Sequence, residues 1–230
     1  MSAARNDLEI LFEDEFLLVL NKPPGLPSQP TVDPKRPDLF TLIKQQLKSE
    51  NIFLHHRLDR DTSGVILLSK NKKANAPLTE MFRRHQFEKI YWALAKPNPK
   101  LQDHWEIQNH LVARRKDSRS VKMFRTESGG DFAQTIFRKL AVSPEACWIE
   151  AEPKTGRTHQ IRVHLLHSEA SILGDSLYGG KDPRVPRLML HAKSLRFPHP
   201  VLGQSLQVEA PLPSDFASLL SKWKLGPQNT

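Results

Sequence analysis

The stretch His56-Arg57-Leu58-Asp59-Arg60-Asp61-Thr62-Ser63-Gly64 places two acids, two arginines and a histidine directly before a Thr-Ser-Gly turn. It runs into Val65-Ile66-Leu67-Leu68, an apolar run of the length typical of a buried strand. Charged side chains beside a core strand are costly to hold unless they are paired. Because Asp59 lies between two arginines, its ionised form is favoured, as a nucleophile or a general base requires.

The composition indicates a soluble globular protein with a polyanionic partner. The 230 residues suffice for a real core, either as one domain or as two closely packed lobes. Lys and Arg number 34 against 25 Asp and Glu, and this net charge of +9 suits nucleic acid. No apolar run approaches the roughly 18 residues that span a membrane, and the N-terminus has no apolar signal core. We therefore expect a cytoplasmic protein without membrane contact.

The apolar pattern predicts more strands than helices. Strands are expected over residues 8–12, 16–20, 65–68, 88–96, 133–142, 147–154, 188–197 and 205–210. Helices are expected over 38–50 with Asp38 as N-cap, over 78–85 with Pro77 in the first turn, over 158–167, and from Ser214. Because several strands follow one another without a helix, we expect an α+β fold on a mixed, largely antiparallel sheet with flanking helices.

Six basic residues and a single acid, Asp117, lie between positions 114 and 125. The basic residues are Arg114, Arg115, Lys116, Arg119, Lys122 and Arg125. Two interpretations stay open for this segment. It is either a solvated loop or an arm that contacts phosphates.

In a further cluster, a Gly-containing turn leads into a predicted helix. The cluster is Thr155-Gly156-Arg157-Thr158-His159-Gln160-Ile161-Arg162-Val163-His164. The N-terminus of a helix carries partial positive charge and unpaired N–H groups. Together with Arg157 and Arg162 it would form an anion receptor. The anion could be a substrate phosphate or the carboxylate of Asp59.

Two other kinds of site are disfavoured. His159, His164 and His167 could be metal ligands, but no cysteine accompanies them and the two nearby arginines would repel a cation. A Ser-His-Asp hydrolase could be built from other residues of the opening stretch, but the chain has no G-x-S-x-G elbow. The chain also lacks a dinucleotide fingerprint and a Gly-rich phosphate loop, so ATP- or NAD-dependent chemistry has no support.

The chain resembles the RluA-type family of RNA pseudouridine synthases from about Leu8 to Phe216. The motifs that carry the resemblance occur in the family's order, at residues 21–26, 56–64, 89–91, 156–164, 172–175, 178–179, 187–192 and 210–213. The resemblance implies a pseudouridine synthase fold with a central active-site cleft. It also implies conversion of uridine to pseudouridine in RNA, without a metal or a cofactor.

The resemblance further implies one catalytic domain over residues 8–224. No additional N-terminal RNA-binding domain is expected, so the catalytic domain itself would select the RNA, which is ribosomal or transfer RNA. Residues 103–131 match the family poorly and contain the basic segment, so we expect them to help in choosing that RNA. A monomer is expected.

Five residues fall on functional positions of the family. Asp59 falls on the essential aspartate, which either attacks the base or sugar or abstracts a sugar proton. Tyr91 falls on the tyrosine that packs against the target base, although the residue pattern alone favours a core-facing strand tyrosine. Arg162 falls on the basic residue that pairs with the aspartate. Arg57 matches an arginine that fills the space of a flipped base, and Ile161 is expected to line the pocket.

Two alternative functions remain from other classes. The chain could be a non-catalytic RNA-binding protein on the same fold, or, more distantly, a metal-dependent hydrolase. Arg60 and Asp61 are expected to hold the turn around Asp59.

Overall fold

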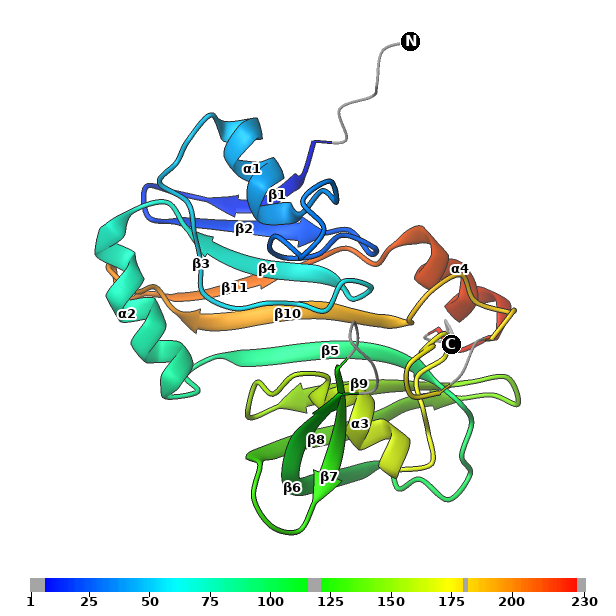
Figure 1. Ribbon diagram of the computed structural model, residues 1–230. Helices are drawn as coiled ribbons and strands as arrows, with labels where there is room; N and C mark the ends of the chain where they lie inside the picture. The colour runs from blue at the N-terminus through cyan, green and yellow to red at the C-terminus, as the bar shows by residue number, and fades with distance from the viewer. Residues whose placement is uncertain (1–6, 116–120, 180–181, 227–230) are drawn as a thin grey trace. The chain divides into compact units, whose positions relative to one another are not determined.

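The computed structural model describes residues 7–115, 121–179 and 182–226, and within them the chain forms two compact units (Figure 1). The first unit runs up to Phe87 and includes Ala192–Pro211, and the second comprises Glu88–His191 and the residues from Leu212 on. Strands outnumber helices in the described chain, which confirms the predicted α+β class. None of the helices in the described ranges is long and apolar enough to cross a membrane.

The sheet of the first unit is built around β4 (Ser63–Ser69), which follows the charged stretch directly. All seven residues of β4 are buried, as its apolar run predicts. Its neighbours in strand order are β2 (Leu17–Lys22), then β1 (Glu9–Glu13), and on the other side β10 (Leu190–Pro198). Two strands lie off this path: β3 (Phe53–Leu54) pairs with β4, and β11 (Ser205–Glu209) pairs with β10.

Two helices accompany this sheet, and one of them begins earlier than predicted. Helix α1 (Leu39–Leu47) has the expected N-cap, because a carboxylate oxygen of Asp38 accepts the N–H of Thr41 at 2.9 Å. Helix α2 (Lys72–Arg83) was predicted to begin at Leu78, and this was wrong. The side chain of Asn71 caps the helix, which begins six residues earlier at Lys72, and Pro77 lies inside it rather than in its first turn.

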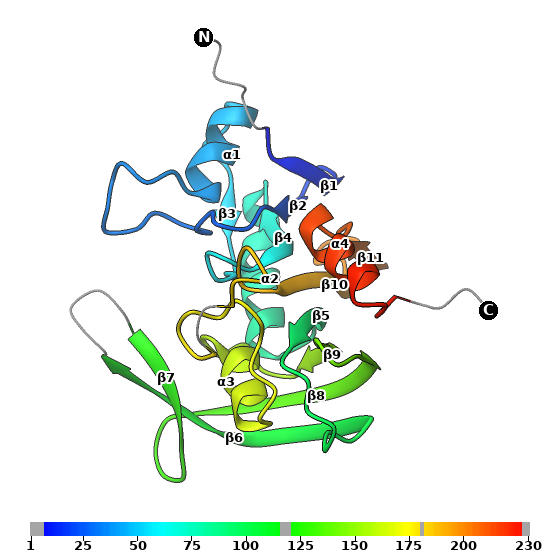
Figure 2. The same cartoon turned by 90° about the vertical axis from the view of Figure 1, so that its right-hand side faces the viewer.

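The second unit contains a sheet in the order β5-β9-β8-β6-β7. These strands are β5 (Glu88–Ala95), β9 (Cys147–Pro153), β8 (Asp131–Val142), β6 (His104–Arg115) and β7 (Val121–Thr126), and each neighbouring pair is antiparallel. Helix α3 (Gln160–His167) contacts β7, β8 and β9 (Figure 2). Helix α4 (Ser214–Lys222) buries its predicted apolar face in the core of this unit.

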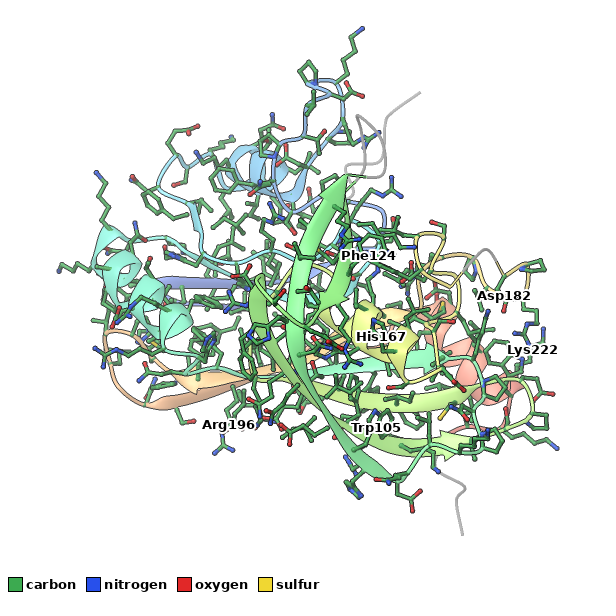
Figure 3. The ribbon with its side chains drawn as sticks, turned by 60° about the horizontal axis from the view of Figure 1, so that its bottom comes forward. Trp105, Phe124, His167, Asp182, Arg196 and Lys222 are labelled. Atoms are coloured by element: carbon green, nitrogen blue, oxygen red, sulfur yellow. The ribbon has the colours of Figure 1, made fainter. Side chains whose placement is uncertain are left out.

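Four of the six basic residues, Arg114, Arg115, Lys122 and Arg125, belong to two strands, so of the two interpretations left open the solvated loop does not hold for these residues. β6 and β7 pair from His110 opposite Thr126 to Arg115 opposite Val121. We call this pair the basic hairpin, and Phe124 is labelled on it in Figure 3. Lys116 and Arg119 lie outside the described residues.

Helix α3 begins two residues later than predicted. Its N-cap, His159, has a left-handed backbone with a φ of 55° and makes no capping hydrogen bond through its side chain. The turn before the helix therefore extends through His159. His167 is the last residue of α3, as predicted, and is labelled in Figure 3.

Candidate functional site

The loop of residues 56–64, here called the aspartate loop, is fixed by two side chains, one from the last residue of β2 and one from the segment that follows it. The buried ammonium of Lys22 donates to the carbonyl of Arg60 at 2.9 Å. The same ammonium also donates to the carbonyls of Pro23 and Leu26, at 2.9 and 2.8 Å. It thereby joins two irregular segments of the backbone.

Ser28 provides the second attachment of this loop. Its hydroxyl donates to the carbonyl of Leu58 at 2.8 Å and accepts the N–H of Leu58 at 3.1 Å. The Leu58 side chain is buried. Because both backbone groups of the residue before Asp59 are held, the backbone that carries the Asp59 carboxylate has little freedom.

The far end of the loop is closed by a turn and a glycine. The N–H of Thr62 donates to the carbonyl of Asp59 at 3.2 Å. Gly64 has a φ of +108°, and a Cβ there would lie 2.1 Å from the carbonyl oxygen of Ala192. Only glycine fits this close approach between β4 and β10.

Other side chains of the aspartate loop pair with each other or with β4 rather than form a hydrolase relay. Arg60 makes a bidentate pair with the neighbouring Asp61, with both N–O distances at 2.8 Å, and both side chains are partly exposed. The Nε2 of His56 accepts the N–H of Leu67 at 2.9 Å, and its ring stacks on Phe82. Because that nitrogen is occupied by a β4 backbone N–H, His56 is not arranged as the base of a Ser-His-Asp triad.

In the second unit, Tyr91 lies on β5 opposite Ala151 of β9 and is half-buried against the core. Lys89 is two residues earlier, on the same face of the strand. Its Nζ lies 3.5 Å from the carbonyl oxygen of Thr155, at the turn that leads into α3. Burial lowers the pKa of the Lys89 ammonium to about 8.

Arg162 is bound by a carboxylate that the sequence analysis did not assign to it. Its guanidinium makes a bidentate pair with Asp175, with Nε to Oδ2 at 2.8 Å and Nη2 to Oδ1 at 2.9 Å. Asp175 is 1% exposed, and its Oδ1 also accepts the N–H groups of Leu177 and Tyr178. Among the described residues of this unit, only Arg162 of the predicted anion receptor binds this carboxylate, whereas Nε of Arg157 donates to the carbonyl of Phe132 at 2.9 Å.

A glycine makes this pairing possible. Gly174 has a φ of +73°, and a Cβ there would lie 1.8 Å from the carbonyl oxygen of Arg187. The glycine therefore fixes the turn that presents Asp175 to α3. The motif Ile172-Leu173-Gly174-Asp175 was the signal from which this partner of Arg162 could have been found.

The histidines of α3 are used in hydrogen bonds rather than as a ligand cluster. His164 is fully buried, with Nδ1 at 2.9 Å from Thr135 Oγ1 and Nε2 at 3.2 Å from Asn109 Oδ1. Burial lowers the pKa of His164 to about 4. His159 Nδ1 lies 2.9 Å from the hydroxyl of Tyr178. Within the described ranges no group of three His, Cys, Asp or Glu side chains is placed to hold a metal ion.

The five predicted site residues divide between the two units. Asp59 and Arg57 lie in the aspartate loop of the first unit, Asp59 half-buried and Arg57 exposed. Tyr91, Ile161 and Arg162 lie in the second unit, on β5 and α3, where Ile161 is buried in the core. Their roles toward RNA stay predictions, and the pairing of Arg162 with Asp59 is one of them.

Comparison with known proteins shows the family. Residues 16–167, more than half of the chain, match the model of the RNA pseudouridylate synthases. An uncharacterised RNA pseudouridine synthase of Bacillus subtilis is 36% identical over 93% of this chain and 71% of its own length. The ribosomal large subunit pseudouridine synthase C of Yersinia pestis is 39% identical over 88% of this chain and 65% of its own length.

Solved structures agree with this assignment. Human RNA pseudouridylate synthase domain containing 4 superposes with a TM-score of 0.73 at 28% identity, covering 94% of this chain and 93% of that one. Human RNA pseudouridylate synthase domain containing 1 has the same fold, with a TM-score of 0.76 at 23% identity over the full length of both chains. Motifs, fold and relatives together show that the chain belongs to the RluA-type family of RNA pseudouridine synthases, isomerases that act on uridine in RNA.

Proposed function

We propose that this protein isomerises uridine in ribosomal RNA, with Asp59 as the essential reacting group. The observation that carries the proposal is the way the chain holds the aspartate loop. Lys22 and Ser28 fix the backbone on both sides of Asp59. Such preorganisation suits a carboxylate that must meet its target in one geometry.

The reaction detaches uracil from its sugar and reattaches it through carbon 5. Asp59 would either attack the base or the sugar, or abstract a sugar proton. Both routes need the ionised carboxylate, because only that form is a nucleophile or a base. The proposal requires neither a metal nor a cofactor.

The remaining site residues are proposed to bind the RNA or to position groups. Tyr91 would pack against the target base, an interaction worth roughly 1–3 kcal/mol for a stacked base. Arg57 would fill the space that the flipped nucleotide leaves, and its exposure supports an RNA-facing role. Arg162 would pair with Asp59, and Ile161 would line the pocket.

The choice of ribosomal RNA over transfer RNA rests on relatives, several of which are named ribosomal large subunit pseudouridine synthases. The basic hairpin supports an extended contact with RNA. Arg114 and Lys122 lie 5.5 and 5.6 Å from the ring centre of the partly exposed Phe124. Cations beside an exposed ring can contact phosphates and a base at the same time. We further propose that the protein is a cytoplasmic monomer.

Pseudouridine mapping tests this proposal. RNA would be compared from a strain that lacks the gene and from strains complemented with the wild type or with Asp59→Asn. We expect at least one ribosomal position to lose its pseudouridine in the deletion strain and to regain it only with the wild type. If the deletion strain instead loses a pseudouridine in transfer RNA, the substrate is transfer RNA and not ribosomal RNA. Salt-sensitive RNA binding without any lost position would instead favour a non-catalytic RNA-binding protein.

A further inference from the structure

Tyr178 contacts both the basic hairpin and the buried Arg162–Asp175 pair. Its hydroxyl oxygen accepts the N–H of Met123, on β7, at 2.8 Å. Its own N–H donates to Oδ1 of Asp175 at 3.1 Å. β7 is the last strand in the order of this unit, so its outer backbone groups face away from β6. The hydroxyl of Tyr178 satisfies one of these groups.

The ring of Tyr178 lies beside two cations. The guanidinium carbon of Arg162 and the Nζ of Lys122 each lie 5.1 Å from the ring centre. Cations at this distance are attracted to the electron-rich face of an aromatic ring. Arg162 is therefore held by the carboxylate of Asp175 and by this ring, and Lys122 of the basic hairpin is attracted to the same ring.

We propose that Tyr178 is a positioning residue that couples the basic hairpin to Arg162. The inference rests on the proposed function, since it assumes that the hairpin contacts RNA and that Arg162 acts at the reaction. The hydroxyl and the ring have separate parts. The hydroxyl fixes the backbone of β7, and thereby the position of the basic side chains on this strand. The ring gives the Arg162 guanidinium a second contact beside the carboxylate of Asp175.

Kinetics of two variants separate these parts. Tyr178→Phe keeps the ring and removes the hydroxyl. The hydroxyl's contacts with the N–H of Met123 and with Nδ1 of His159 are both lost. We expect KM for the RNA to rise about threefold to tenfold, because β7 loses its contact with Tyr178, with kcat within about twofold of the wild type. Tyr178→Leu removes the ring as well. We expect kcat to fall by roughly tenfold in addition, because the Arg162 guanidinium loses its contact with the ring. The kcat rescue by Phe is the signature that a merely structural role would not give.

Asn98→Ala serves as the matched control, since Asn98 lies outside the basic hairpin. It removes two hydrogen bonds in the same unit, one from Nδ2 of Asn98 to the carbonyl of Ser168 and one from the N–H of Lys100 to Oδ1 of Asn98, each 3.0 Å long. We expect a loss of melting temperature like that of Tyr178→Phe, with KM and kcat unchanged. If the control changes KM as much as Tyr178→Phe does, the effect of Tyr178 is general destabilisation and the inference is wrong.

Binding measurements test the coupling without catalysis. Affinity for a fluorescein-labelled stem–loop RNA would be measured in a double-mutant cycle of Lys122→Gln and Tyr178→Leu. We expect Lys122→Gln to weaken binding in the wild-type background and to have at most half that effect in the Tyr178→Leu background. Independent effects would contradict the coupling. An inactive wild type that still shows the coupling would refute the proposed function and leave the role of Tyr178 standing.

Discussion

The aspartate loop and the segment of residues 157–179, here called the arginine segment, each contain a bidentate Arg–Asp pair in very different surroundings. The side chains of Arg60 and Asp61 are 54% and 35% exposed, whereas those of Arg162 and Asp175 are 10% and 1% exposed. Exposed pairs are worth about 0–1 kcal/mol, but breaking a buried pair costs about 3–5 kcal/mol. The Arg–Asp pair therefore contributes strongly to the stability of the arginine segment and little to that of the aspartate loop.

The comparison shows how each region is fixed. In the aspartate loop the restraint comes from hydrogen bonds of Lys22 and Ser28 to backbone groups. These contacts leave the shape of the loop independent of its surface charges. In the arginine segment, the charge pair itself positions the guanidinium. Removing charge should accordingly disturb the second region and spare the first.

Asp175→Asn should have the largest effect on stability. It keeps the shape and removes the counter-charge of the buried Arg162, so we expect the free energy of unfolding to fall by about 4 kcal/mol in urea titrations. Asp182→Asn is the control in the same unit, because its partner Arg184 is 46% exposed. A similar loss in both variants would mean that burial does not distinguish the two pairs.

Lys22→Met should have the second largest effect on stability. It leaves three backbone carbonyls around the aspartate loop without the ammonium donor, and we expect a loss of about 3 kcal/mol in the free energy of unfolding. The kcat for RNA should fall in the same variant, because the loop backbone is released. Normal kcat at a temperature where the variant is folded would show that Lys22 does not position Asp59.

His164 predicts a pH dependence of stability. Its folded pKa of about 4 is below the usual 6.5, so between these values the unfolded chain binds a proton that the folded chain does not. As pH falls from 6.5 to 4, the free energy of unfolding should drop by on the order of 3 kcal/mol from this group, and above 6.5 it should be unaffected. His164→Gln should flatten this part of the pH profile, and an unchanged profile would refute the assignment.

Asp61→Asn should have the smallest effect. It breaks only the exposed pair with Arg60, so we expect a change below about 1 kcal/mol in the free energy of unfolding and little change in kcat. A loss as large as that of Asp175→Asn would contradict the contrast between the two regions.

Local sequence patterns predicted the elements that depend on neighbouring residues alone. The apolar run after Gly64 gave β4, and the side chain of Asp38 gave the start of α1. The start of α2 is not predicted correctly, because proline is common in the first turn of a helix and Pro77 instead lies inside this one. β6 is not predicted although Trp105, Ile107 and Leu111 have the spacing of one strand face, because the polar residues between them also suit a loop.

Pairings between distant residues could not be predicted from local patterns. The partner of Arg162 within its unit is thirteen residues away, and the contact between Lys22 and Arg60 joins residues 38 positions apart. Charge and spacing identify such residues as candidates without fixing which groups meet. The motifs that contain Lys22 and Asp175 were identified through the family resemblance. The groups that each side chain binds are seen only in the structure.

Tritium release from RNA labelled at carbon 5 of uridine measures the reaction assigned to Asp59, because isomerisation detaches that hydrogen. Purified wild type and Asp59→Asn would be compared on the RNA that mapping identifies, with melting temperatures to show that both are folded. We expect steady release by the wild type and a rate lower by roughly a thousandfold or more for Asp59→Asn. Release by a folded Asp59→Asn at the wild-type rate would mean that Asp59 is not the reacting group.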